Sequence, residues 1–153
     1  MSDDTAAGGP TFHHVNLKTT RLQEMIDWYG AVVGTEVVFQ DATGAWLSND
    51  TANHRIALLA FPSFVDDPDK DTRTGMHHSA FEFDTFAALN DNYVRLREAG
   101  ITPELCLDHG MTLSYYYRDP DANHVELQCE IHRRAMDGEL APPRPPVEIP
   151  SGG

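Results

Sequence analysis

The sequence predicts an α+β fold of two βαβββ modules, and the main observation behind this prediction is an internal repeat. The segment "FHHVNL" at residues 12–17 is echoed by "MHHSAF" at residues 76–81. Later in each half, "ANHRIAL" at residues 52–58 is echoed by "ANHVELQ" at residues 122–128. Neither half is large enough to bury much core alone. We therefore expect the two modules to pack into one domain with a mixed sheet that curves around a cavity.

Each module is predicted to begin with a strand followed by a helix. Apolar and polar residues alternate after each histidine pair, as they do in a half-buried strand. A tyrosine follows at the same spacing in both halves, Tyr29 after His14 and Tyr93 after His78. Apolar residues at helical spacing mark one face of each helix: Leu22, Ile26, Tyr29 and Val33 in the first, and Phe86, Leu89, Tyr93 and Leu96 in the second.

The ends of both helices also carry sequence signals. "TRLQ" at residues 20–23 matches a capping box, in which a Thr side chain binds the first turn. Asp84 or Thr85 can cap the second helix in a similar way. Gly34 and Gly100 are predicted to end the helices, because glycine readily adopts the left-handed conformation common at helix C-termini.

Three further strands complete each module. They are "EVVFQ", "AWLSN" and "ANHRIAL" in the first half, and "ELCLD", "TLSYYY" and "ANHVELQ" in the second. The expected organisation is a flexible N-terminus at 1–10, one domain at 11–131 and a Pro-rich tail at 132–153. Within the domain, module 11–61 and module 76–131 flank a linker at 62–75 whose Pro, Asp and Gly content indicates a loop.

Composition excludes several classes of function. The chain has 153 residues, and its 24 acidic against 11 basic residues give a net charge of −13. Such a surface repels nucleic acids and anionic lipid, and no apolar run reaches the ~18 residues of a membrane span. Cys106 and Cys129 are too few and too far apart for a disulfide framework. Because the acidic start also lacks the apolar core of a secretory signal, the sequence indicates a cytoplasmic protein that binds neither nucleic acid nor membrane.

Glu126 stands among apolar residues of the last strand, where an ionised carboxylate is costly unless it is paired or binds a metal. The repeat assigns it three corresponding positions, which are His14 and His78 on the first strands and Ile56 on the last strand of the first half. If these strands face one cavity, two imidazoles and one carboxylate meet on one side of a metal ion, and the fourth corner is apolar. This facial arrangement with open positions opposite suits Fe(II) and oxygen chemistry.

Other histidines and acids near these positions have simpler interpretations. His13 and His77 each precede a predicted ligand, and neighbours on a strand face opposite ways. We predict that the second histidine of each pair points inward and that the first packs or supports the site. His54 and His124 are expected to pack at a turn or an interface, or to line the cavity mouth. The acidic run at 66–71 is expected to be a solvated loop or a lid near the site.

The segment "HGMTLSYYYRDPDANHVE" at residues 109–126, with the histidine pairs, resembles the vicinal oxygen chelate superfamily, which includes glyoxalases and fosfomycin-resistance proteins. The resemblance covers roughly residues 11–131 and is strongest to the single-domain type I extradiol ring-cleavage dioxygenases. It implies that His14, His78 and Glu126 are the ligands of Fe(II), with Mn(II) as an alternative, in the cavity between the modules.

The same resemblance implies roles for two further residues and for the partners. His109 corresponds to the acid/base residue beside the metal, and Tyr116 corresponds to the tyrosine that hydrogen-bonds the substrate. The implied reaction is the Fe(II)-dependent extradiol cleavage of a small catecholic substrate by dioxygen, in an enzyme expected to be a homodimer. The two catechol oxygens and dioxygen would use the open coordination positions.

Two alternatives remain open at this point. A metal site with three protein ligands also suits another metalloenzyme of the same fold, such as a Mn-, Ni- or Zn-dependent transferase, lyase or isomerase. A non-catalytic protein that binds a drug or a metabolite is a third possibility, although such proteins usually lack the metal ligands. Metal content separates the two enzymes from the binding protein, and dioxygen uptake with a catechol separates the two enzymes.

Overall fold

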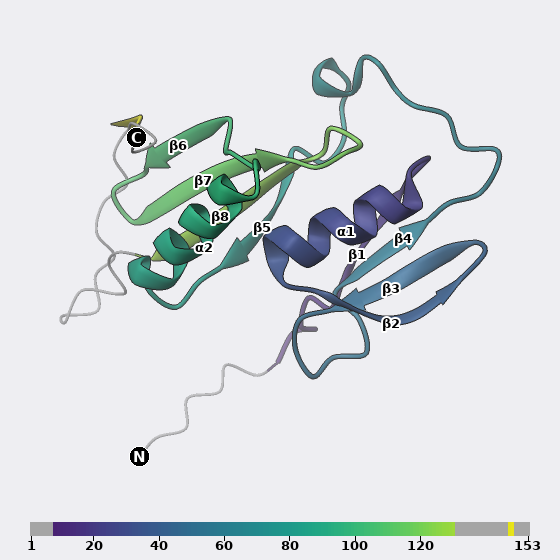
Figure 1. Ribbon diagram of the computed structural model, residues 1–153, viewed down its shortest axis with the longest axis horizontal. Coiled ribbons are helices and arrows are strands. Elements are labelled where there is room, and N and C mark those ends of the chain that lie inside the picture. Colours follow the sequence, from purple (N-terminus) through teal and green to yellow (C-terminus); the bar gives the residue numbers. More distant parts are fainter. Residues whose placement is uncertain (1–7, 131–146, 149–153) are drawn as a thin grey trace.

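The computed structural model describes residues 8–130 and 147–148, and its elements follow the predicted order (Figure 1). Each half contains a strand, a helix and three more strands. In chain order the elements are β1 (Val15–Lys18), α1 (Leu22–Val33), β2 (Glu36–Asp41), β3 (Gly44–Ser48), β4 (Ile56–Leu59), η1 (Lys70–Thr72), β5 (His78–Glu82), α2 (Phe86–Glu98), β6 (Leu105–Asp108), β7 (Thr112–Arg118), β8 (His124–Glu130) and β9 (Val147–Glu148).

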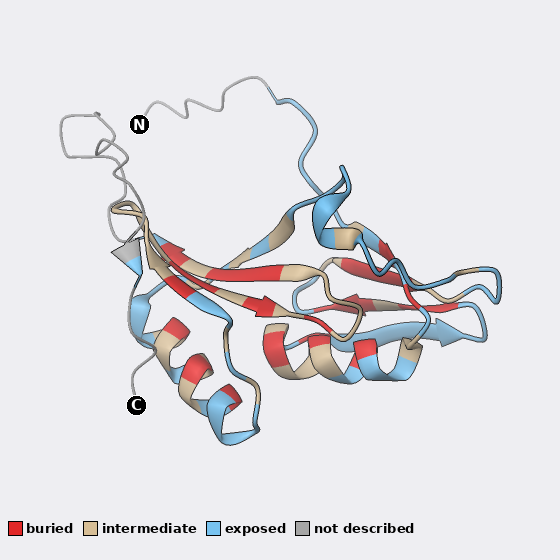
Figure 2. Cartoon of the chain, turned by 90° about the horizontal axis from the view of Figure 1, so that it is seen from above, coloured by how far each residue is buried: buried red, intermediate tan, exposed pale blue. Residues whose placement is uncertain are grey.

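The strands form two mixed sheets, one for each module. The first sheet has the order β1-β4-β3-β2, and the second has the order β5-β8-β7-β6-β9. In each sheet the first strand of the module runs parallel to the last one, and the other neighbours are antiparallel. The helices lie on the same side of the two sheets (Figures 1 and 2). The predicted α+β fold with two βαβββ modules is therefore confirmed, but the strands form two mixed sheets rather than the one mixed sheet that was expected.

The core lies between the helices and the sheet faces that they cover, as the buried residues in Figure 2 show. The buried helix residues are Met25, Ile26, Tyr29 and Val32 in α1, and Leu89, Tyr93 and Leu96 in α2. Phe86 was predicted on the same face of α2 but is exposed. Tyr115 and Tyr117 on β7 join this core. In the part of the chain that the structure describes, no helix covers the other face of each sheet, here called the open face.

The helix ends agree with the sequence signals in three cases out of four. Thr85 caps α2, because its side chain accepts a hydrogen bond from the Ala88 amide. Gly34 and Gly100 follow the two helices with positive φ angles of 75° and 81°, as glycine does at such ends. The capping box at 20–23 was wrong. The hydroxyl of Thr20 donates to Asp66 in the linker, and no side chain caps the start of α1.

The two chain ends are described only in part. Residues 8–10 of the predicted flexible N-terminus are exposed and lack regular structure, while residues 1–7 lie outside the described residues. In the predicted tail, residues 147–148 form β9, which pairs antiparallel with β6 at the edge of the second sheet. The remainder of 132–153 also lies outside the described residues. Within the described ranges, no helix is long and apolar enough to cross a membrane.

A buried hydrogen bond joins the two modules. The Tyr29 hydroxyl on α1 donates to Asp119 Oδ2 in the turn between β7 and β8, at 2.9 Å. Asp119 also accepts from the backbone amides of Asp121 and Asn123 and from the side-chain amide of Asn123. Burial, followed by the charge of Asp119, raises the pKa of the Tyr29 hydroxyl far above its usual range. The hydroxyl therefore stays protonated and serves as a permanent donor across the junction.

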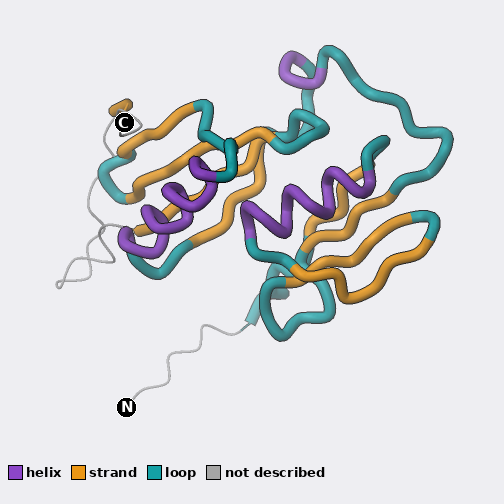
Figure 3. Tube along the Cα trace, viewed as in Figure 1, coloured by secondary structure: helices purple, strands orange, loops and turns teal. Residues whose placement is uncertain are grey.

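The linker between the modules is attached to both of them, although it is mostly loop (Figure 3). On the first module, the Arg21 guanidinium forms an ion pair with Asp66 of the linker. The same guanidinium reaches Asp121 of the second module at 2.6 Å. The Lys70 ammonium in η1 donates to the Asp121 carbonyl at 2.8 Å and to Asn123 Oδ1 at 3.0 Å. These contacts fix the path of the linker along the β7–β8 turn.

We expect Tyr29→Phe to lower the free energy of unfolding by about 1–2 kcal/mol, because the buried Asp119 loses one donor and the ring stays in place. Urea unfolding followed by circular dichroism measures this change. Gln23→Ala is the control, since the Gln23 amide donates to the exposed Asp27 on the same helix, and its loss should cost at most about 0.5 kcal/mol. Equal losses in the two variants would contradict a stabilising role for the junction.

Candidate metal and substrate site

The second sheet presents Glu126 on its open face. On β8 the neighbouring residues Val125 and Leu127 belong to the core, so the alternation of a strand turns Glu126 to the other side. Even there the residue is only 6% exposed. A carboxylate so far removed from water needs partners for both oxygens, and adjacent strands provide them.

His78 and Tyr116 supply these partners. β5 pairs with β8 so that Ala80 lies opposite Glu126, and His78, two residues earlier, shares its face. The His78 Nε2 atom lies 3.0 Å from Glu126 Oε2. On the other side, Tyr116 of β7 lies opposite Glu126, and its hydroxyl donates to Oε1 at 3.2 Å. Both carboxylate oxygens are thus engaged.

His109 extends this group through Tyr116. The Nε2 atom of His109 lies 3.1 Å from the Tyr116 hydroxyl oxygen. The turn between β6 and β7 holds His109 in place, because its amide donates to the Thr112 carbonyl and Gly110 adopts a φ of 84°. Since the Tyr116 proton points to Glu126, the network assigns the proton of this second bond to His109 Nε2.

Burial, and secondarily the charge of Glu126, raises the pKa of the Tyr116 hydroxyl. Tyr116 therefore stays protonated at neutral pH and remains a hydrogen-bond donor. His109, Tyr116, Glu126 and His78 form a continuous line of polar groups across the open face of β5, β8 and β7. We call these four residues the second-module cluster.

The structure does not bring His14 to the second-module cluster. His14 precedes β1, and its Nδ1 atom lies 2.9 Å from Nδ1 of His13. Its ring centroid is 4.3 Å from that of His54, which precedes β4. Ring nitrogen atoms of His13, His14 and His54 all lie within 4.8 Å of one another. We call these three residues the tri-histidine cluster. Four of the five predicted site residues are thus together, and His14 lies in a different group.

His54 has an altered acidity in this group. Partial burial, followed by the nearby His14 and His13, lowers the pKa of His54. The imidazole of His54 is therefore neutral at physiological pH, and a neutral imidazole has a free lone pair that can bind a metal. The sequence repeat marks His54 as the counterpart of His124, but nothing in the repeat predicts that its ring meets the first histidine pair.

Ile56 was expected at the apolar fourth corner of the cavity, and this expectation was wrong. Ile56 pairs with Val15 and is fully buried in the core. The reason is a difference of one residue in register: Asn16 pairs with Ala57 in the first sheet, whereas its repeat counterpart Ala80 pairs with Glu126. Such a shift exchanges the two faces of a strand. Ala57 occupies the position that corresponds to Glu126, and it too offers no metal ligand.

The donors of the second-module cluster fit a first-row divalent metal ion. An imidazole nitrogen and a carboxylate oxygen only 3.0 Å apart can share one ion. The Tyr116 hydroxyl donates to the other oxygen of Glu126 and would thereby orient the carboxylate toward the ion. His14 is the third donor that the sequence predicts, and the structure holds it in the tri-histidine cluster.

A groove of about 840 Å³ opens beside His78, within the range of small-molecule sites. It lies between the segment before β1 and the open face of β5. Apolar side chains and one guanidinium group contribute to its walls. The lining residues include Phe12, His13, Arg55, Met76, His78 and Phe81.

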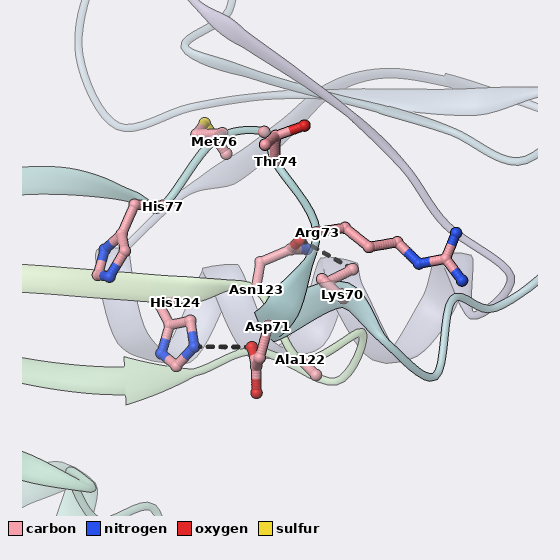
Figure 4. A pocket seen from close by; sticks show the side chains of 10 residues that line it. Lys70, Asp71, Arg73, Thr74, Met76, His77, Ala122, Asn123 and His124 are labelled. Carbon is pink, nitrogen blue, oxygen red and sulfur yellow. Dashed lines mark hydrogen bonds and ion pairs between the residues drawn. The ribbon is translucent and has the colours of Figure 1, made fainter.

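Part of the acidic run at 66–71 lies near the second histidine pair, in a small pocket (Figure 4). Asp71 Oδ1 is 3.1 Å from His124 Nε2, and Arg118 pairs with the other oxygen of Asp71. The hydrogen bond of His124, followed by that of Arg118, lowers the pKa of Asp71. From the sequence, a position near the site was one of two alternatives for this run. No local sequence pattern indicates that Asp71 contacts His124, which is distant in the chain.

Comparisons with known proteins agree with this architecture. The model of the Glyoxalase/Bleomycin resistance protein/Dioxygenase superfamily matches residues 11–127. Biphenyl-2,3-diol 1,2-dioxygenase 2 of Rhodococcus globerulus is 42% identical over 121 residues, which are 79% of this chain and 63% of that protein. Biphenyl-2,3-diol 1,2-dioxygenase 3 of the same organism is 40% identical over 79% of this chain and 64% of that protein. The chain thus spans less than two thirds of the length of these relatives.

Solved structures support the fold. A glyoxylase/bleomycin resistance protein/dioxygenase domain from Frankia sp. EAN1pec superposes with a TM-score of 0.66 at 19% identity, covering 80% of this chain and 99% of that one. At this identity the likeness concerns the fold alone. Together with the family match over most of the chain, it shows that the protein belongs to the Glyoxalase/Bleomycin resistance protein/Dioxygenase superfamily.

Proposed function

We propose that this protein cleaves the ring of a small catecholic compound beside its two hydroxyl groups, using dioxygen and a bound Fe(II) ion. The observation that carries this proposal is the second-module cluster beside a groove, in which the buried Glu126 contacts the predicted ligand His78 and, through Tyr116, is linked to the predicted acid/base residue His109. The identity to two proteins named as dioxygenases of an aromatic diol supports it. Mn(II) is the alternative ion.

The metal would be held by His78 and Glu126, with His14 as the third protein ligand. When bound, such an ion makes a coordinated hydroxyl group more acidic and brings the diol and dioxygen together. The protein contributes the rest. Tyr116 orients Glu126 through its hydrogen bond. Its single proton is used there, so Tyr116 can accept a hydrogen bond from a substrate hydroxyl, or donate to a substrate oxygen in place of Glu126. The groove excludes part of the surrounding water from the ring of the substrate.

His109 would move the protons of the reaction. An imidazole can accept and return a proton near neutral pH, and ring cleavage requires both steps, first from a substrate hydroxyl and then to a reduced oxygen. The 3.1 Å contact with Tyr116 holds the His109 ring on the open face, where a substrate held by His78 and Glu126 would lie. Nε2 carries a proton in this contact, so a substrate proton would be taken by Nδ1, or by Nε2 in the other tautomer. The homodimer and the cytoplasmic location that the sequence suggested stay predictions.

The decisive experiment is a spectroscopic scan of the Fe(II)-loaded protein, prepared without oxygen and then mixed aerobically with a panel of catechols. We expect dioxygen uptake together with the yellow absorbance of a ring-opened semialdehyde. Bound metal without oxygen uptake would contradict the proposal and favour another metalloenzyme of the superfamily. Binding of an aromatic ligand without any bound metal would instead favour a sequestering protein.

Glu126→Gln should weaken Mn(II) binding at least about 10–100-fold, the range for loss of a residue that merely supports a metal ligand. The amide keeps the shape of the side chain but loses the charge. Electron paramagnetic resonance of free Mn(II) measures the affinity. Glu82→Gln is the matched control, because Glu82 is an exposed residue of β5. The ligand assignment fails if both variants bind Mn(II) as well as the unmodified protein does.

His109→Ala should lower kcat by about 10²–10⁴-fold, the usual contribution of a general acid/base, while the metal content stays unchanged. Oxygen uptake with the best catechol of the panel gives kcat, and atomic absorption gives the metal content. His124→Ala removes a different histidine of the second module, one that pairs with Asp71 rather than with the second-module cluster, and serves as the control. A loss of activity below about tenfold would exclude His109 as the proton carrier.

A further inference from the structure

Hydrogen bonds of the neighbouring residues hold the tri-histidine cluster in the first module. Arg55 Nη1 donates to the His13 carbonyl at 3.0 Å, and Arg55 Nε pairs with Asp50 at 2.8 Å. The Val15 amide donates to the Arg55 carbonyl, also at 3.0 Å. The residues next to His54 and His14 are therefore tied together through the backbone. Because these bonds already position the segment, an ion that binds all three rings loses less binding free energy to ordering it.

The repeat provides an internal comparison for this cluster. His77, His78 and His124 are the counterparts of His13, His14 and His54. In the second module two of the three imidazole rings contact a carboxylate. His78 lies 3.0 Å from Glu126, and His124 lies 3.1 Å from Asp71. In the described part of the first module, the side-chain partners of the three rings are the rings themselves.

We infer that the tri-histidine cluster is a second metal site, which takes a zinc-like divalent ion. Three converging imidazoles with no carboxylate among them are a donor set for Zn²⁺, Ni²⁺ or Cu²⁺ rather than for Mg²⁺, which prefers oxygen. Three histidines and one open position also match the usual four-coordinate geometry of zinc. His13 and His14 are exposed, so an ion can reach the site directly from solvent.

One further consequence rests on the proposed function. A neutral imidazole has a single lone pair, because its other ring nitrogen carries a proton. His14 can therefore complete the tri-histidine site or join the ion at His78 and Glu126, but it cannot do both at once. The two sites then compete for one side chain, and an ion in the first module would withhold a ligand from the catalytic metal.

The experiment uses the full chain carrying His78→Ala and Glu126→Gln, so that it is independent of the proposed catalytic site. Zn²⁺ is titrated by calorimetry, with Mg²⁺ as the negative probe. We expect one equivalent of Zn²⁺ to bind and Mg²⁺ not to bind. Adding His54→Ala should weaken the affinity for Zn²⁺ on the order of 100-fold, since a direct ligand is worth at least as much as a supporting one.

Matched variants at the repeat positions separate the site from a general effect of histidine loss. Adding His124→Ala, the counterpart of His54→Ala, should leave the affinity within about threefold, a small fraction of the loss expected for a ligand. His13→Ala and its counterpart His77→Ala form a second, independent pair, and thermal melting verifies that each variant is folded. Failure of the starting chain to bind Zn²⁺ overturns the inference, as does equal weakening by both members of each pair.

Discussion

A carboxylate that is nearly excluded from water must have its oxygens paired, and Glu126 imposes this condition on the second module. His78 and Tyr116 satisfy it from the two neighbouring strands, and His109 is held in turn by Tyr116. All of these contacts require that β5 and β7 pair with β8 in the observed register, which places Ala80 and Tyr116 opposite Glu126. A slip of one residue in any of these strands would send a partner into the core. The chemistry of the site therefore depends on backbone pairing as much as on residue type.

The two modules show how one pattern of residues leads to two different environments. Both contain a histidine pair and a later Asn-His dipeptide in the same order. In the first module the offset register buries Ile56 and leaves Ala57 on the open face, so the nearby imidazoles find one another, and no carboxylate, as side-chain partners among the described residues. In the second module Glu126 and Asp71 reach two of the equivalent rings. Repeat symmetry in the sequence therefore overstates the symmetry of the sites.

Sequence patterns predicted the features that depend on local chemistry. The helical spacing of apolar residues marked the buried faces of both helices, and glycines marked their C-terminal ends. The features that the sequence did not predict depend on distant contacts. Thr20 turns to Asp66 instead of capping α1, and the ring of His14 joins His54, which is 40 residues later (54 − 14). A local sequence pattern does not indicate which distant residue a side chain will contact once the chain has folded.

The attachment of the linker limits how this molecule can admit a substrate. Arg21 of the first module pairs with Asp66 of the linker and with Asp121 of the second module. The Lys70 ammonium of the linker donates to the Asp121 carbonyl in the β7–β8 turn. A swing of one half against the other would break these bonds together with the buried Tyr29–Asp119 contact. The aromatic substrate proposed above would then enter by displacing exposed side chains at the edge of the groove, such as Phe12 and Met76, without movement of the modules. Selectivity would accordingly reside in the size of these rim residues.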